Sequence, residues 1–181
     1  FGQPSVTNVS CYNGSNGSIS ISAAGGTGAI SYTISPNAGS QPTAGNFINL
    51  PANNYLITAT DANNCFVSIP VTVSEPDQLV LGTPTVQHLS CFGDNNGTIT
   101  ISATGGTGTI TYSISPNNGS QPIPVSFIGV TADSYTITAT DANNCTTSTV
   151  VVVNQPTEII FGTPNVTNVT CYNAGNGSVT K

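Results

Sequence analysis

The chain has 181 residues, of which only 4% are charged, and a net charge of −6 at pH 7; ordinary globular domains are about 25% charged. Lys181 is the single basic residue, so no cluster of Lys and Arg is present to neutralise phosphates, which argues against nucleic acid and anionic lipid as partners. No apolar run approaches the roughly 20 residues of a membrane helix, and Phe1 does not open a signal peptide, so we expect no membrane insertion in this segment.

An internal repeat organises the whole chain. Residues 6–19 recur as residues 86–99 and again as residues 166–179. Residues 1–80 superpose on residues 81–160 without a gap. The chain is therefore an array of one 80-residue unit, and its function has to be sought in the array.

Short links separate the units. Residues 75–78 and 155–158 each include a proline and contain no flexible Gly/Ser tract, so they are expected to hold neighbouring units end to end with limited freedom. We predict sandwich repeats at residues 1–76 and 77–156, followed at 157–181 by the first strands of an incomplete third repeat.

Apolar residues alternate with Ser and Thr along most of each unit, a period of two that is typical of half-buried strands. In the first unit the expected strands cover residues 18–23, 29–35, 46–50, 55–61 and 65–74. Residues 5–11 are expected to form an irregular first strand, because Val6 and Val9 do not alternate, and residues 36–45 a loop. Pro70 predicts an edge position for the last strand, because proline cannot donate to a ladder.

These strands predict an all-β fold of tandem immunoglobulin-like antiparallel β-sandwich repeats arranged end to end. The basis is six or seven short strands per unit, with turns every 8–12 residues and no helical periodicity. Tyr55 and Tyr135 each open the penultimate strand, the position of the tyrosine corner in such sandwiches. Strands of this length add on the order of 35 Å per unit to a rod.

The five cysteines follow the repeat: Cys11, Cys91 and Cys171 occupy one position, and Cys65 and Cys145 another. All five are disulfide candidates, because fixed spacing without a CxxC or Cys/His cluster favours disulfides in an oxidising compartment over zinc; reduced, inert thiols are the alternative. Within one unit the favoured bridge is Cys11–Cys65. A bridge between units, Cys65–Cys91 or Cys11–Cys145, is the other possibility.

The unit resembles the SprB-type repeat of large surface proteins in Bacteroidetes-type bacteria. The resemblance is carried by residues 6–19, 25–32 and 50–65 and by Glu75-Pro76, and it spans the whole unit in both copies. Residues 30–34 depart from it, because they lack the proline and tryptophan usual there. The resemblance implies secretion to the bacterial cell surface, filaments, and adhesion to surfaces or polysaccharide.

Candidate chemistry outside the cysteines is sparse. His88 is the only histidine, and Asn8 and Asn168 replace it in the other units, so that position does not require an imidazole. Asp61, with its neighbouring asparagines, offers oxygens to Ca²⁺, but one carboxylate suits an Asx turn that caps a hairpin better. We therefore expect no cofactor and no metal, with Ca²⁺ as the weak alternative. No Ser/His/Asp set or carboxylate pair is apparent, and an enzyme is not expected.

The aromatic residues Tyr12, Phe92 and Tyr172 follow the first cysteine of each unit. They are expected to pack on a disulfide, with stacking against a glycan as the alternative. The sequence thus predicts the shaft of a long extracellular bacterial filament or surface adhesin, whose partners are neighbouring repeats or like chains. The alternatives are a carbohydrate-binding module for surface polysaccharide, and a self-polymerising fibre subunit completed by strand donation from a neighbouring chain.

Overall fold

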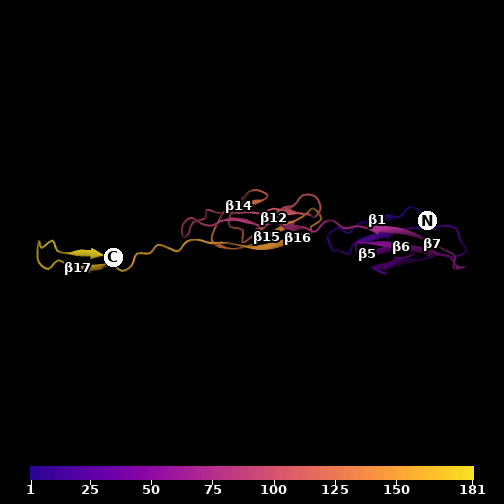
Figure 1. Cartoon of the computed structure of the whole chain (residues 1–181), viewed down its shortest axis with the longest axis horizontal. Helices are drawn as coiled ribbons and strands as arrows, with labels where there is room; N and C mark the ends of the chain where they lie inside the picture. The colour runs from indigo at the N-terminus through magenta and orange to yellow at the C-terminus, as the bar shows by residue number, and fades with distance from the viewer.

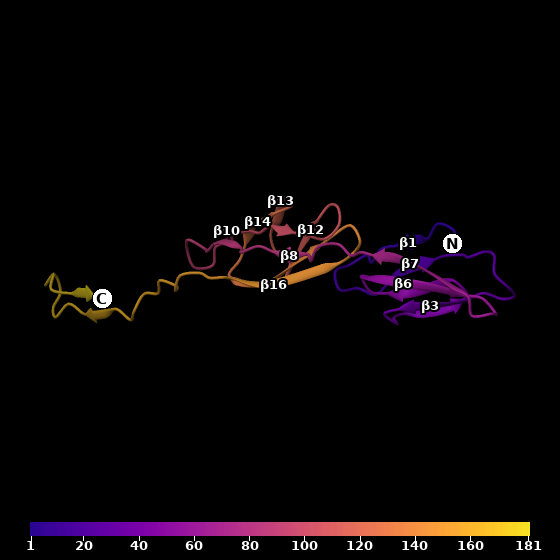
Figure 2. The same ribbon diagram turned by 45° about the vertical axis from the view of Figure 1, so that its right-hand side comes forward.

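Three groups of strands follow one another along a line in the computed structural model, which describes residues 1–181 (Figure 1). The turned view keeps the same order, with the incomplete unit at one end of an extended molecule (Figure 2). Every regular element is a β-strand. The division of the chain at residues 76/77 and 156/157 remains a prediction.

The first group forms a two-sheet sandwich. One sheet has the order β1-β2-β5-β4 and the other β3-β6-β7, which is the strand arrangement of a seven-stranded immunoglobulin-like sandwich. The strands are β1 (Ser5–Thr7), β2 (Gly17–Ser20), β3 (Ser31–Ser35), β4 (Ser40–Thr43), β5 (Asn46–Leu50), β6 (Asn53–Thr60) and β7 (Phe66–Val73). β7 lies at an edge, as Pro70 predicts.

The second group repeats the first, with sheets β13-β14-β10-β9 and β12-β15-β16. Its strands are β9 (Thr85–Gln87), β10 (Gly97–Thr100), β12 (Thr111–Ser115), β13 (Ser120–Ile123), β14 (Ser126–Val130), β15 (Asp133–Thr140) and β16 (Thr146–Val153). All strand pairs are antiparallel. The expected fold class is confirmed.

Alternation along the strands builds the core. Tyr55, Ile57 and Ala59 of β6 share one face and are buried, and the corresponding residues of β15 are buried too. The Tyr55 hydroxyl donates to the Pro51 carbonyl at 2.9 Å, and burial raises the pKa of this hydroxyl. This is the predicted tyrosine corner, and it ties the turn before β6 to the core.

One local expectation is wrong, and the structure explains another. Residues 36–45 contain β4, because Ser40–Thr43 pairs with β5 although all four residues are exposed and show no apolar alternation. The first strand is irregular because the chain changes partner: β1 pairs with β2, whereas the Val9 amide donates to the Ser74 carbonyl beyond β7. Val9 is thereby buried, while Val6 is not.

The third group is a lone hairpin of β17 (Asn165–Thr167) and β18 (Ser178–Thr180). Its strands pair only with each other. Val179 is 70% exposed, whereas Ile19 at the same place in the first unit is fully buried. The opening strands of a unit therefore do not bury their apolar face without β5 and the second sheet.

Candidate functional site

A disulfide joins the two complete sandwiches. Cys11 and Cys145 are bonded through their sulfurs, and their Cα atoms are 5.7 Å apart, within the usual range for a disulfide. Cys11 lies in the turn between β1 and β2, and Cys145 in the hairpin between β15 and β16. Beside the bond, the Asn143 side-chain amide donates to the Ser10 carbonyl at 2.9 Å.

The favoured intra-unit bridge Cys11–Cys65 is therefore wrong, and the inter-unit alternative Cys11–Cys145 is present. Cys65 directly precedes β7, whereas the chain just before Cys11 bonds to Ser74, beyond the other end of β7. An eight-residue strand is about 26 Å long, far more than the roughly 7 Å that a disulfide spans between Cα atoms. The two cysteines of one unit consequently lie at opposite ends of the sandwich.

An aspartate shapes each hairpin that carries the second cysteine. In repeat two, Asp141 Oδ1 accepts the amides of Asn143 at 2.9 Å and Cys145 at 2.8 Å, and its Oδ2 accepts the Thr107 amide at 2.8 Å. Burial acts to raise the pKa of the Asp141 carboxyl, but these three N–H donors outweigh it and keep the pKa below its ordinary value. The carboxylate thus fixes the loop in which Cys145 is presented.

Asp61 does the same in repeat one. The Thr27 amide, then those of Cys65 and Asn63, hold the pKa of the Asp61 carboxyl below its ordinary value. The expected Asx turn is present, with Oδ1 accepting the amides of Asn63 and Cys65, each at 2.9 Å. No cluster of three His, Cys, Asp or Glu side chains is placed to hold a metal ion, and the Ca²⁺ alternative remains an untested prediction.

The link between the sandwiches is itself bonded to the second one. The Gly106 amide donates to the Asp77 carbonyl at 2.9 Å. β8 (Val80–Leu81) pairs with β11 (Ala103–Thr104). Leu79 is 7% exposed and lies against Gly106, where a Cβ would come within 3.3 Å of its Cδ1. The link is therefore part of the second sandwich and not a free tether.

The two glycines that follow β11 lie against the link. Gly105 has a φ of +79°, and a Cβ there would lie 1.9 Å from the Gln78 carbonyl oxygen. Gly25 is its counterpart in repeat one, and a Cβ there would meet nothing within 4 Å. Together with the disulfide, these contacts define the joint: Cys11, residues 76–81, Gly105, Gly106, Asp141 and Cys145.

The other three cysteine candidates, Cys65, Cys91 and Cys171, are free and exposed. Cys65 lies at the far end of repeat one, in the position that Cys145 has in repeat two. Cys91 lies at the far end of repeat two, in the position that Cys11 has in repeat one. Whether these thiols form disulfides remains a prediction.

The aromatic residues beside the first cysteines are partly open to solvent. Tyr12 is 43% exposed and lines a pocket at the joint together with Cys11 and Cys145. Phe92 is 49% and Tyr172 95% exposed. Packing on the disulfide and glycan stacking both remain predictions for these residues.

His88 has a structural role that an asparagine also fills. Its Nδ1 accepts the Asn154 amide at 3.1 Å, as Asn8 Oδ1 accepts the Ser74 amide at 3.1 Å in repeat one. Both bonds fasten the first strand to the end of β7 or β16.

The sequence did not predict the roles of Leu79 and of the glycines in the joint. The available signal was the apolar residue that follows each Pro-containing link.

The 80-residue unit recurs along the chain, and comparison with known families agrees with that period. The SprB repeat model matches residues 4–39 and 83–119. Two segments of the chain thus match the SprB repeat, in agreement with the resemblance found in the sequence. Each match lies in the first half of an 80-residue unit and contains its first cysteine, Cys11 or Cys91.

Comparison with solved structures finds a distant likeness. A C-terminal 282-residue fragment of intimin, solved with the intimin-binding domain of the translocated intimin receptor, is 13% identical with a TM-score of 0.41. The match covers 82% of this chain and 64% of that fragment, so the chain spans less than two thirds of its length. No curated protein matches. The structure contains no apolar helix of membrane-spanning length.

Proposed function

We propose that this chain is a structural and adhesive repeat module that forms the shaft of a long extracellular bacterial filament or surface adhesin. The Cys11–Cys145 bond carries the proposal, because it joins one sandwich covalently to the next. A catalytic or recognition domain needs no such bond to its neighbour. A shaft that transmits force benefits from such a bond, because the bond carries load past the fold of each sandwich.

The joint gives the two sandwiches two covalent connections, the link and the disulfide. The link is also held by the Gly106–Asp77 hydrogen bond and by burial of Leu79. These contacts fix the link to the second sandwich, so the link is not a free tether between the two. Stable disulfides are typical of oxidising compartments, which supports an extracellular location, as does the SprB repeat.

The recurring polar residues of the repeat favour a structural role over an enzymatic one. The recurring carboxylates, Asp61 and Asp141, accept backbone N–H groups in turns. His88 is used in the same way as an asparagine. The recurring polar groups of the repeat therefore serve the fold and the joint.

Pulling on the two ends of a single molecule tests the mechanical part. With the disulfide intact, force passes from Cys11 directly to Cys145, and the 134-residue separation between them is shielded. Reduction should release about 450 Å of additional length at about 3.4 Å per residue. Cys65→Ser, a change at a free cysteine, should leave the oxidised trace as it is. Equal lengths before and after reduction would remove the basis of the proposal.

Labelling of intact cells tests the location. An antibody against repeat two should decorate unpermeabilised cells that make the protein, along projecting filaments with a regular axial beat. Labelling that appears only after permeabilisation would contradict a surface shaft.

A carbohydrate-binding module is the second candidate, favoured by the aromatic residue exposed after the first cysteine of every unit. Tyr12, Phe92 and Tyr172 are exposed to 43%, 49% and 95%, and an aromatic ring with an open face can stack on a sugar. A glycan array probed with the full chain tests this candidate. Glycan binding that is lost in the double variant Tyr12→Ser with Phe92→Ser would favour the carbohydrate-binding module. Absence of glycan binding would leave the shaft as the proposed function.

A further inference from the structure

The last strand of each sandwich has an unpaired edge. β7 pairs only with β6, and β16 pairs only with β15. The first strand of repeat two bonds to this edge only beyond the end of β16. There the Leu89 amide donates to the Asn154 carbonyl, and the Asn154 amide donates to the His88 imidazole. An unpaired strand edge is a template for pairing with another chain.

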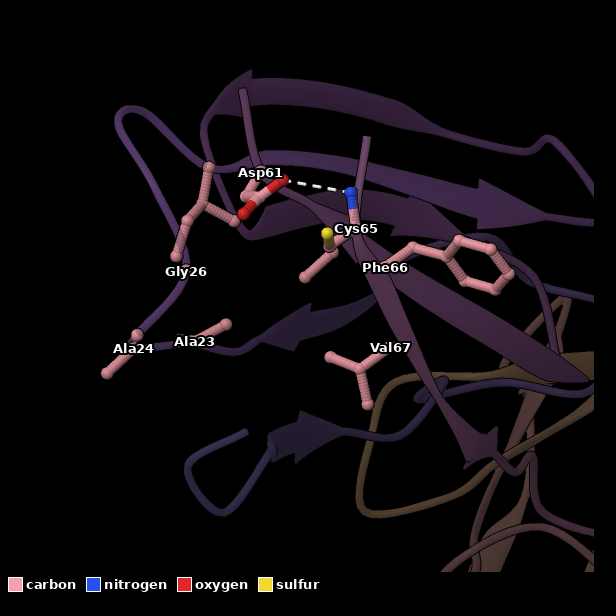
Figure 3. A pocket seen from close by; sticks show the side chains of 10 residues that line it. Ala23, Ala24, Gly26, Asp61, Cys65, Phe66 and Val67 are labelled. Carbon is pink, nitrogen blue, oxygen red and sulfur yellow. Dashed lines mark hydrogen bonds between the residues drawn. The ribbon is translucent and has the colours of Figure 1, made fainter. Parts of the chain in front are cut away.

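The hairpin before each of these strands fixes which backbone groups face the open edge. In repeat one the Asp61 amide donates to the Cys65 carbonyl, and the Asp61 carboxylate accepts the Cys65 amide (Figure 3). Every second residue after Cys65 therefore bonds to β6, because the residues of an antiparallel strand bond alternately to its two sides. The residues between them direct their N–H and C=O groups to the open edge: Phe66, Ser68, Pro70 and Thr72.

Repeat two has the same register, since the Asp141 amide donates to the Cys145 carbonyl. The residues of β16 that face the open edge are Thr146, Ser148, Val150 and Val152, and none of their backbone groups has a backbone partner. Pro70 has the place of Val150 in repeat one, and proline has no N–H group to donate. β16 therefore presents an unbroken row of donors and acceptors, whereas the row on β7 is interrupted.

β16 also lacks the features that usually protect a strand edge. Lys, proline and bulges serve that purpose in other sheets. Residues Thr146–Val153 include no charged residue, no proline and no glycine, and they pair with β15 without a bulge. Val150 is 63% and Val152 52% exposed. Uncharged segments rich in β-branched residues are those that pair with copies of themselves, which favours β16 of a second chain as the partner.

Neighbouring repeats do not cover this edge. Pro70 and Thr72 are exposed although repeat two follows repeat one. Thr146 and Ser148 are exposed although repeat one precedes repeat two. β16 runs along one side of the second sandwich (Figure 2). The open edge therefore lies on the flank of the rod and not at its ends.

We propose that β16 is a docking site for β16 of a second copy of this chain, so that two rods pair side by side. The two strands run antiparallel about a twofold axis, with Ser148 opposite Val150 of the second copy and Thr146 opposite Val152. In this register the outward N–H and C=O groups of all four residues find partners. Pairing stops before Asn154, where the first strand covers the edge. The contact joins the two three-stranded sheets into one.

This lateral contact goes beyond the proposed shaft. It uses the flank of a sandwich, whereas the Cys11–Cys145 bond uses the boundary between two sandwiches. Neither contact requires the other, so each can be tested by itself.

Analytical ultracentrifugation of the purified full chain tests the pairing. The free thiols are alkylated beforehand without reduction, so that no new disulfide forms and the Cys11–Cys145 bond stays intact. We expect a reversible equilibrium between monomer and dimer. Val150→Pro should raise the dissociation constant about tenfold or more, because each copy loses an N–H donor in the middle of the contact. Pro70→Val should strengthen association, because it completes the row on β7.

Val150→Pro is expected to fold, since repeat one has proline at the same place of an equivalent strand. A pair of lysine variants leaves the backbone bonds unchanged. Val152→Lys places a charge in the contact and should also raise the dissociation constant about tenfold or more. Val67→Lys is the matched control, because Val67 is 50% exposed on β7, and it should leave association unchanged. Thermal unfolding confirms that each variant is folded.

Two outcomes overturn the proposal. One is a wild-type chain that stays monomeric at the highest soluble concentration. The other is a dimer whose dissociation constant is the same in folded Val150→Pro and Val152→Lys chains. Either outcome refutes pairing through β16 alone, because the stapled shaft is tested separately by the change in length on reduction under force.

Discussion

Cys11 and Cys145 are bonded across the boundary between two sandwiches, although 134 residues separate them along the chain. The bond connects the first cysteine of one repeat to the second cysteine of the next. Cys65 and Cys91, the remaining cysteines of the two complete repeats, are free and exposed in this structure.

Leu79 should be the apolar anchor of the joint. Leu79→Ala is expected to lower the free energy of unfolding of the chain by about 2 kcal/mol or more, because Leu79 is 7% exposed and a cavity remains. Ile159→Ala is the matched control, at the same repeat position but 97% exposed, and should change stability by less than about 0.5 kcal/mol. Urea unfolding of both variants measures the difference, and equal effects would show that Leu79 does not anchor the joint.

Gly105 and Gly25 form a second matched pair. Both have a positive φ, so alanine introduces comparable backbone strain of about 1–2 kcal/mol at either position. Only at Gly105 does the new Cβ meet the backbone of the link, at Gln78. Gly105→Ala should therefore cost a further 1–3 kcal/mol, roughly the effect of overpacking, and should broaden the inter-sandwich distance distribution in small-angle scattering. If Gly105→Ala and Gly25→Ala were equally destabilising, the close contact between Gly105 and the link would be refuted.

Acid should weaken the fold through Asp61 and Asp141. The folded chain holds both carboxyl pKa values below those of the unfolded chain, which lie near 3.9 for aspartate. Their stabilisation is complete above the unfolded pKa and is lost as the pH falls through the folded pKa, because the unfolded chain binds protons first.

Urea unfolding of the wild type between pH 7 and pH 2 should show this loss. The double variant Asp61→Asn with Asp141→Asn should be less stable at pH 7 and should show a flatter pH dependence. A double variant that follows the wild-type profile would mean that other groups control the acid response.

The tyrosine corner should contribute measurably in each repeat. Tyr55→Phe removes one buried hydrogen bond, to Pro51, and should cost about 1 kcal/mol. Tyr12→Phe alters a partly exposed tyrosine and should stay within about 0.5 kcal/mol of wild type. Thermal unfolding of both variants measures the difference. If Tyr55→Phe were as stable as the wild type, the hydrogen bond of the tyrosine corner would not contribute to stability.

The amino-acid sequence by itself determined the repeat, the strands and the sandwich class. These are local properties: Tyr55, Ile57 and Ala59 share a face because side chains alternate along any strand. The alternation pattern did not predict β4, because Ser40–Thr43 has no buried side chain and pairs with β5 only through its backbone.

Only the tertiary structure decided how the cysteines pair and what surrounds them. Cys11 and Cys65 are closer in sequence than Cys11 and Cys145, yet β7 holds them at opposite ends of one sandwich. A disulfide requires two Cα atoms to lie close together in space. That distance is set by how the repeats are arranged in the structure, and not by the number of residues between the cysteines. The burial of Leu79 also depends on tertiary packing, because Gly106, against which it lies, belongs to a turn far along the chain.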